Sequence, residues 1–171
     1  INYGENPAID ITMSGTVGAA MEGASRGIPS LAVSIQLENE DYLGYSKDVD
    51  FTTAAVFTRR FAKVLLEKKM PEDVNVLNIN VPSDANPDTG WRITRLSRQP
   101  YFKAYLRETS RPDKPWTVDA RPDPDPEELA DPTTDAATFK KDRLVSVTPL
   151  SLDMTSRVHL PDLQTLIGNL D

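Results

Sequence analysis

Three stretches decide the fold: SLAVSIQL (residues 30–37), FTTAAVFTRRFAKVLLEKK (residues 51–69) and VNVLNINV (residues 74–81). The first is short and apolar and lies between Pro29 and an acidic stretch, which is typical of a buried strand. The third breaks strict alternation, as expected for a strand covered on both faces. The middle stretch repeats apolar residues at helical spacing along one face, and Pro71 follows its end. Strand, helix and strand in this order predict an α/β layer with parallel strands.

Upstream of this unit, residues 1–13 form a polar, turn-prone loop, and residues 14–26 are predicted to be a helix. Ser14 suits the N-cap of this helix and Gly27 suits its end. A stripe of small residues recurs every four positions and predicts close packing along one face: Gly15, Ala19, Gly23 and Gly27. The chain opens on Ile1 inside what reads as a functional loop, so we expect the first strands to lie upstream of residue 1.

After Pro82 the sequence becomes more polar and richer in proline. Residues 91–96 and 101–107 could pair as extended strands, and residues 109–133 hold six of the 14 prolines, which predicts a long loop or arm. Residues 134–142 read as a short helix capped by Thr134, residues 144–148 as a strand, and residues 160–170 as a final helix. We therefore divide the chain into a core part (1–82), an extended arm with a proline-rich loop (83–133), and a return strand with a C-terminal helix (134–171).

Composition excludes several classes of protein. The net charge of -7 and the pI of about 4.8 argue against a protein that binds nucleic acid through its phosphate backbone. The absence of cysteine excludes disulfides and thiolate metal sites. No apolar run reaches the roughly 18 residues of a membrane span. With no signal peptide visible, we expect a cytoplasmic protein that contacts neither nucleic acid nor membrane.

The opening loop carries the residues best suited to chemistry. Gly15 and the hydroxyls of Ser14 and Thr16 stand at a helix start, where free backbone N–H groups favour an anion such as phosphate. The side-chain oxygens of Asn2 and Asn6 suit a hard cation such as magnesium or manganese. The same residues also read as a helix cap with turn-forming glycines and asparagines, and physics alone leaves both interpretations open.

Three other groups have a structural interpretation that we favour over a functional one. His159, the only histidine, is expected to have a solvent or packing role, because no partner for catalysis is evident. An acidic run lacks the glycine of a calcium loop and reads as a solvated loop: Asp123, Asp125, Glu127, Glu128 and Asp131. A mixture of basic and aromatic residues could stack a nucleobase, but reads better as an arm with one packed face: Arg92, Arg95, Arg98, Lys103, Trp91, Tyr101 and Phe102.

The stretch INYGENPAIDITMSGTVGAAMEGASRGIPSLAVS (residues 1–34) resembles the SurE family, whose members carry a glycine–asparagine loop, a Ser-Gly-Thr-Val helix start and a Gly-Ile-Pro-Ser turn into a strand. Two later stretches agree with that family. NINVP (residues 78–82) is similar to its second strand end. Thr134-Asp135 followed by VSVTPL (residues 145–150) is similar to its closing signature. The matches follow the family's order along almost the whole chain.

The resemblance implies a Rossmann-like layered sheet with helices on both faces, in a phosphomonoesterase that hydrolyses nucleoside monophosphates at the 5′ or 3′ position and, in some members, short polyphosphate. It implies Mg²⁺ or Mn²⁺ as cofactor, Asn2 as a metal ligand, and a phosphate pocket at Asn6, Ser14, Gly15 and Thr16. The family's catalytic Asp-Asp pair has no counterpart here. We therefore expect no catalytic residue in this chain, with that aspartate upstream of residue 1.

In such proteins the arm and the C-terminal tail pack on another subunit, so the resemblance implies a homodimer or tetramer with an exchanged C-terminal helix. An alternative stays open. The chain could be a truncated or degenerate member that binds nucleotide, or assembles with partners, without catalysis.

Overall fold

A five-stranded sheet forms the middle layer of the protein. The computed structural model describes residues 1–36 and 49–168. In sheet order the strands are β1 (Asn2–Tyr3), β2 (Ser30–Ile35), β3 (Val76–Val81), β7 (Val145–Leu150) and β4 (Trp91–Ile93). The two strands predicted from apolar character, β2 and β3, are central in it, and every residue of β3 is buried, as expected for a strand covered on both faces.

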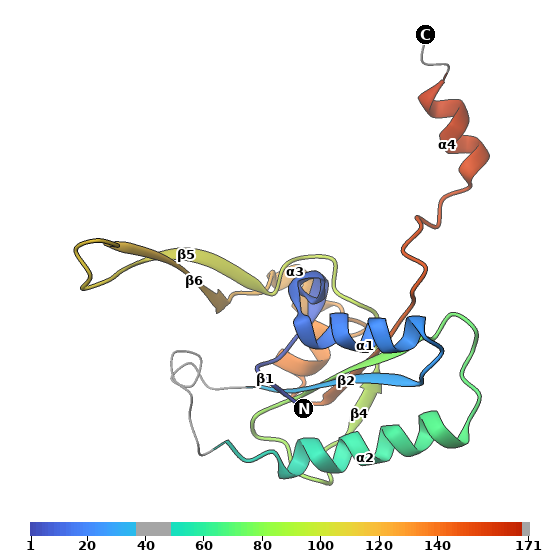
Figure 1. Cartoon of the computed structure of the whole chain (residues 1–171), viewed down its shortest axis with the longest axis horizontal. Helices are drawn as coiled ribbons and strands as arrows, with labels where there is room; N and C mark the ends of the chain where they lie inside the picture. The colour runs from blue at the N-terminus through green and yellow to red at the C-terminus, as the bar shows by residue number, and fades with distance from the viewer. Residues whose placement is uncertain (37–48, 169–171) are drawn as a thin grey trace.

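Two helices cover opposite faces of this sheet (Figure 1). Helix α2 (Thr52–Glu67) packs its apolar face on the side of the sheet that includes Val33 and Ile35. Helix α1 (Gly15–Ser25) packs on the other side, which includes Ala32. Because successive side chains of a strand point to opposite faces, β2 contributes to both cores. The expected α/β layer with helices on both faces is confirmed.

The predicted parallel arrangement of β2 and β3 is confirmed, and the sheet as a whole is mixed. Strands β1, β2 and β3 are parallel, whereas β7 runs antiparallel to β3, with Asn80 opposite Ser146. The short helix η3 (Ala137–Lys141) and Arg143 precede β7 and bring the chain to the edge where β3 ends. The chain can therefore return beside β3 without the crossover connection that a parallel strand would need.

The predicted pairing of residues 91–96 with residues 101–107 is wrong. Strand β4 instead joins the main sheet, parallel to β7. The partner of β5 (Phe102–Glu108) is β6 (Trp116–Pro122), which lies inside the proline-rich segment. That segment also forms α3 (Pro126–Ala130). Prolines stand at or beyond the ends of β6, where a missing N–H group does not interrupt the ladder.

The small-residue stripe on α1 is not the packed face. The side chains that meet the sheet are those of Val17, Ala20, Met21 and Ala24. Gly15 and Gly27 have open space where a Cβ would stand, and only Gly23 closely approaches a neighbouring strand, at Ser30.

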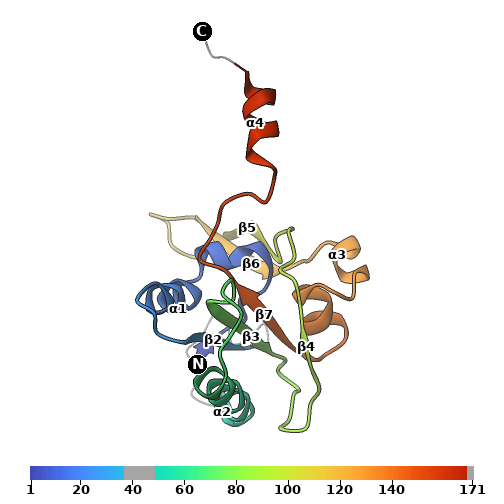
Figure 2. The same cartoon turned by 90° about the vertical axis from the view of Figure 1, so that its right-hand side faces the viewer.

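Among the described residues, three further helical segments lie outside the two layers that cover the sheet. Helix η1 (Ala8–Met13) leads into α1. Before η3, the hydroxyl of Thr134 accepts a hydrogen bond from Ala137 N at 3.1 Å, which confirms Thr134 as a cap. Helix α4 (Leu160–Ile167) carries Pro161 in its first turn and stands away from the body (Figure 2). The last residues of its predicted range, and Leu37 at the end of the predicted first strand, lie outside the described residues. Nowhere in residues 1–36 and 49–168 is a helix both long and apolar enough to cross a membrane.

Candidate functional site

The opening loop runs along the edge of the sheet where the parallel strands end. Strand β1 places Asn2 beside Ser34 of β2, and Gly4 N then donates to Ile35 O at 3.2 Å. Gly4 is buried and has a φ of 103°, a backbone conformation that a side chain would strain. The loop thus turns sharply over the ends of β2 and β3, the part of an open α/β sheet where ligands bind.

Two buried asparagines on β3 hold the opening loop against the sheet. The backbone N–H of Asn6 donates to Asn80 Oδ1 at 2.7 Å, and its carbonyl accepts from Asn78 Nδ2 at 2.9 Å. Both asparagines are fully buried on β3. An unpaired backbone N–H or carbonyl group beside these buried side chains would cost free energy of folding. The two amides therefore fix the position of the loop relative to the sheet. The sequence marked Asn78 and Asn80 only through the family resemblance and assigned them no role.

A buried carboxylate fixes the next turn. Ala8 has a φ of 60°, and its N–H donates to Asp135 Oδ2 at 2.8 Å. Asp135 Oδ1 also accepts from the backbone N–H groups of Ser97 (2.9 Å) and Ala136 (2.8 Å). Burial raises the pKa of Asp135, and these three hydrogen bonds oppose that rise. Asp135 therefore joins three segments that are far apart in the sequence.

A second polar cluster closes the same edge of the sheet. Arg143, with a φ of 55°, donates to Gln36 Oε1 at 2.7 Å and to Asp84 Oδ1 at 2.6 Å. Its guanidinium holds the pKa of the Asp84 carboxyl below the usual range. Arg143 thus ties the start of β7 to the segments that follow β2 and β3. No motif in the sequence pointed to this role.

The start of α1 forms the anion-binding side of the candidate site. Ser14 is the N-cap, as predicted, and its hydroxyl accepts from Val17 N at 3.2 Å. Gly15 is exposed and leaves open space where a Cβ would be, and Thr16 is partly exposed. The first backbone N–H groups of a helix point outward and carry partial positive charge. This end of α1 can therefore receive a phosphate group.

Asn2 and Thr16 line one hollow of about 360 Å³, together with Ile1, Leu31, Val33 and Thr58. Asn2 Nδ2 donates to Gly4 O at 2.6 Å, which turns Asn2 Oδ1 away from the loop. Within the described part of the chain, neither Asn2 Oδ1 nor the Thr16 hydroxyl has a hydrogen-bond partner. The structure thus brings the predicted metal ligand and one predicted phosphate ligand to the same cavity.

Asn6 is placed differently. Its side-chain nitrogen donates to Ser34 Oγ at 2.8 Å and approaches Gly4 O at 3.3 Å, so its amide nitrogen faces the sheet and the loop. Asn6 does not line the hollow shared by Asn2 and Thr16. In this arrangement it shapes the loop, and its remaining side-chain oxygen is the atom left for a ligand.

The donor set suits a hard cation but is incomplete. An amide oxygen such as Asn2 Oδ1 is a ligand that Mg²⁺ and Mn²⁺ accept. Among the residues that the structure describes, however, no three His, Asp or Glu side chains form a group that could hold a metal ion. Asn2 Oδ1 is therefore a single candidate ligand and does not form a complete metal site within the described part of the chain.

The alternative candidates have structural roles. His159 is exposed and pairs with Asp162 at 3.1 Å. The acidic run serves local structure: Asp125 caps α3 and Asp131 pairs with Arg95 at 2.6 Å. Both observations agree with the solvated interpretations favoured above.

The basic and aromatic residues do not gather into one stacking surface. Tyr101 is buried against Ala8 and Phe139, and burial, with a smaller contribution from the Glu5 carboxyl, raises its pKa. Trp91 instead lies on β4, edge-on to Phe61 with their ring centres 5.4 Å apart. The structural interpretation of these residues fits better than a nucleobase platform.

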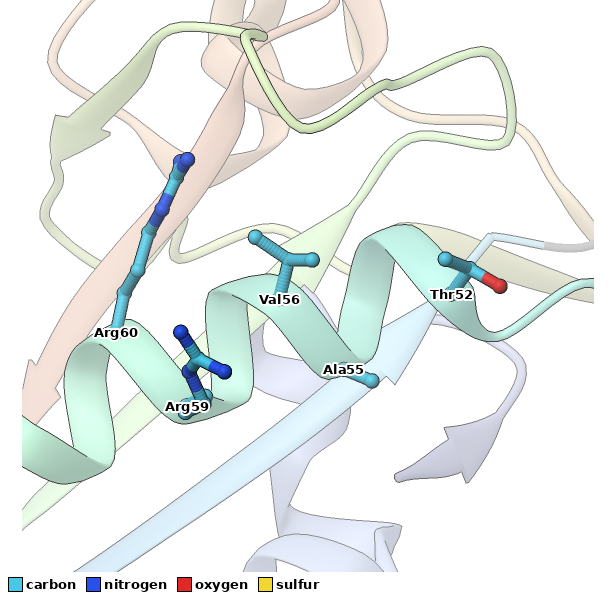
Figure 3. A pocket seen from close by; sticks show the side chains of 5 residues that line it. All are labelled: Thr52, Ala55, Val56, Arg59 and Arg60. Atoms are coloured by element: carbon cyan, nitrogen blue, oxygen red, sulfur yellow. The ribbon is translucent and has the colours of Figure 1, made fainter.

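A larger hollow is not the candidate site. It measures about 510 Å³ and lies along α2 (Figure 3), where it is lined by Thr52, Ala55, Val56, Arg59 and Arg60. It has no carboxylate or amide group that could hold a metal, and no residue of the opening loop reaches it. The smaller hollow at Asn2 is favoured on chemical grounds.

Comparison with known proteins adds an independent line of argument. Residues 1–103 match the model of the family described as "Survival protein SurE". Proteins named "5'-nucleotidase SurE" from Thermococcus gammatolerans and Thermococcus kodakarensis are 44% and 39% identical over 98% of this chain. The chain spans 62% and 63% of the length of these two relatives.

A solved structure is also similar. The crystal structure of the SurE protein from Aquifex aeolicus superposes with a TM-score of 0.69 at 30% sequence identity. The match covers 98% of this chain and 63% of that one. Sequence and fold therefore lead to the same group of proteins.

Proposed function

The chain belongs to the SurE family, and on that premise we propose that the complete protein is a metal-dependent phosphomonoesterase that hydrolyses nucleoside monophosphates. The two Thermococcus relatives are named 5′-nucleotidase SurE and extend beyond the region matched here. We extend the proposal to hydrolysis at the 3′ position and of short polyphosphate. A site that binds mainly the phosphate group need not contact the rest of the substrate.

One observation carries this proposal. Asn2 Oδ1 and the Thr16 hydroxyl, both without hydrogen-bond partners among the described residues, line one hollow beside the start of α1. A cation ligand and an anion-binding helix start then lie side by side, as the two halves of a metal-bound phosphate ester require.

The roles of the chain's own residues follow from the geometry. The Thr16 hydroxyl and the N–H groups of the first turn of α1 would donate to the phosphate oxygens, with Gly15 allowing close approach. Ser14 would hold that turn in place as its cap and could donate its own proton. Asn6 would fix the loop and offer its remaining oxygen.

Asn2 Oδ1 would be one ligand of Mg²⁺ or Mn²⁺. When bound, the divalent cation would neutralise the charge that develops on the transferred phosphoryl group. Since the described residues contain no group of three acidic or histidine ligands, we propose that the other ligands, a catalytic aspartate among them, lie in the part of the protein that the relatives have beyond the matched region.

Phosphate release from AMP, measured with the complete protein, tests the function. We expect release with Mn²⁺ and loss of that release with EDTA. No release from any nucleoside monophosphate in the presence of Mn²⁺ or Mg²⁺ would reject the proposal. Nucleotide binding without hydrolysis would instead favour the non-enzymatic alternative.

We also propose a homodimer or tetramer that uses the arm, defined as β5 and β6 (residues 102–122), and the tail, defined as residues 151–168. Both extend from the body (Figures 1 and 2). Both expose apolar side chains, among them Leu106 and Val118 on the arm and Leu166 on the tail. A two-stranded hairpin is marginally stable alone, and such exposed residues favour a partner surface.

The cytoplasm stays our prediction for the compartment, and cell fractionation would test it.

A further inference from the structure

The root of the arm is attached to the segment that leads into α1. One oxygen of Asp10, Oδ2, accepts from Tyr101 N at 2.7 Å and from Phe102 N at 2.9 Å. These are the backbone groups at which β5 begins, and Asp10 lies on η1, which ends at Met13, directly before Ser14. Hydrogen bonds to a charged acceptor are stronger than neutral ones, so this attachment is firm.

The arm has little other support from the body. Its strands pair only with each other among the described residues. At the root, Tyr101 is buried with Ala8 and Phe139, and its carbonyl accepts from Asp123 N at 2.9 Å, so both strands of the arm meet at Tyr101. Tyr101 and Asp10 therefore connect the root of the arm to η1.

The two ends of the opening segment are held differently. Asn6 is fixed to the sheet by partly buried hydrogen bonds, and Ala8 is fixed to Asp135 by a buried one. After Ala8, the described hydrogen bonds that hold η1 to the rest of the fold from outside are those of Asp10. The cap that follows is local, since Ser14 N donates to Ile11 O at 3.1 Å and the Ser14 hydroxyl receives Val17 N.

We propose that Asp10 is a positioning residue that couples the arm to the phosphate-binding start of α1. The carboxylate holds η1 against the arm root, and η1 in turn sets where Ser14, Gly15 and Thr16 stand. The proposal deepens the function proposed above and rests on it for its kinetic readout only.

The test uses the complete protein with Asp10→Ala and, in case that variant folds poorly, Asp10→Asn, which keeps the side chain's shape. The control is Asp113→Ala, which removes the same charge at the tip of the arm, where Asp113 pairs with Arg111 and does not touch the root. Amide hydrogen exchange is followed at Val17 and Gly18, whose N–H groups donate to Ser14. Amides of α2 serve as the internal reference.

We expect exchange at Val17 and Gly18 to speed up about tenfold in the Asp10 variants, with α2 and the Asp113 variant unchanged. We further expect the KM for AMP to rise roughly fivefold with kcat within twofold of wild type, since binding of the phosphate group is what the cap serves. Exchange at these amides equal to that of the Asp113 variant would overturn the coupling. An equal rise throughout α2 would also overturn it, because it would show only a general loss of stability. A protein that hydrolyses no nucleotide would reject the proposed function, while the exchange result would still decide the coupling.

Discussion

Asp135 and the two asparagines Asn78 and Asn80 illustrate how single residues set the site. All three are polar and fully buried, and the side chain of each forms a hydrogen bond with the backbone of another segment. The residues that face the hollow, Asn2 and Thr16, keep polar atoms free. The sequence could predict Asn2 and Thr16, because helix starts and turns have local signals. It could not predict the role of the three buried residues, because their hydrogen-bond partners are up to 127 positions away.

Asp135→Ala should destabilise the fold. It would leave three buried backbone N–H groups without their acceptor, at roughly 1–3 kcal/mol for each such group, so we expect a loss of at least about 3 kcal/mol. Urea unfolding of the variant measures this. Asp162→Ala, an exposed acidic residue on α4, is the control and should change the midpoint little. Equal midpoints for the two variants would contradict the role of Asp135.

Thr16→Val should weaken substrate binding without loss of the fold. It removes one hydroxyl beside the phosphate position, and a hydrogen bond to a charged group contributes about 1.5–3 kcal/mol, so the KM for AMP should rise tenfold or more. Ser25→Ala removes a hydroxyl from the last turn of the same helix, where it donates to Glu22 O, and should leave KM unchanged. Steady-state kinetics of both variants decide the matter.

At the level of elements, the apolar and helical patterns predicted β2, α2 and β3 well, since each buries side chains in a period that the sequence displays. The arm was predicted with the wrong partner strand. β5 and β6 expose most of their side chains, so their pattern carries little signal, and prolines near β6 favoured a loop. On α1, the stripe of small residues predicts close packing along a whole face, whereas only Gly23 of the stripe closely approaches β2. A repeat of small residues does not say which face of a helix is buried.

Gly23 gives a test of that α1–β2 contact. A Cβ at Gly23 would stand 2.8 Å from Ser30 Oγ, a short side chain that cannot move far. Gly23→Ala should therefore destabilise by about 1–3 kcal/mol despite the better helix propensity of alanine. Adding Ser30→Ala should recover most of the loss, and a thermal unfolding cycle of the single and double variants measures the coupling. Additive effects would show that the two elements do not meet as described.

At the scale of the whole molecule, the arm and the tail stand out among the described residues, because each exposes large apolar side chains. Leu106 and Val118 lie opposite each other across the arm and are both largely exposed, and Leu166 is exposed on α4. The buried core, by contrast, lies between the sheet and its two helices. We therefore expect the body to carry the candidate site and the two extensions to contact another subunit.

Sedimentation at micromolar concentration tests this division. We expect a dimer or tetramer for the wild type and a smaller species for Leu106→Asp combined with Val118→Asp, since two charges would be buried in the contact. Asn86→Asp, at an exposed position of the body outside the arm and the tail, adds one charge and should leave the assembly intact. A wild-type protein that sediments as a monomer would exclude the assembly.

A titration of AMP hydrolysis with Mn²⁺ tests the central claim most directly, with the complete protein, Asn2→Ala and His159→Ala. Asn2 Oδ1 is the proposed metal ligand, and His159 has no proposed role. We expect Asn2→Ala to need about tenfold or more Mn²⁺ to reach half-maximal rate and to have a lower maximal rate, while His159→Ala follows the wild-type curve. The same manganese dependence in Asn2→Ala and wild type would contradict the assignment of Asn2 to the metal.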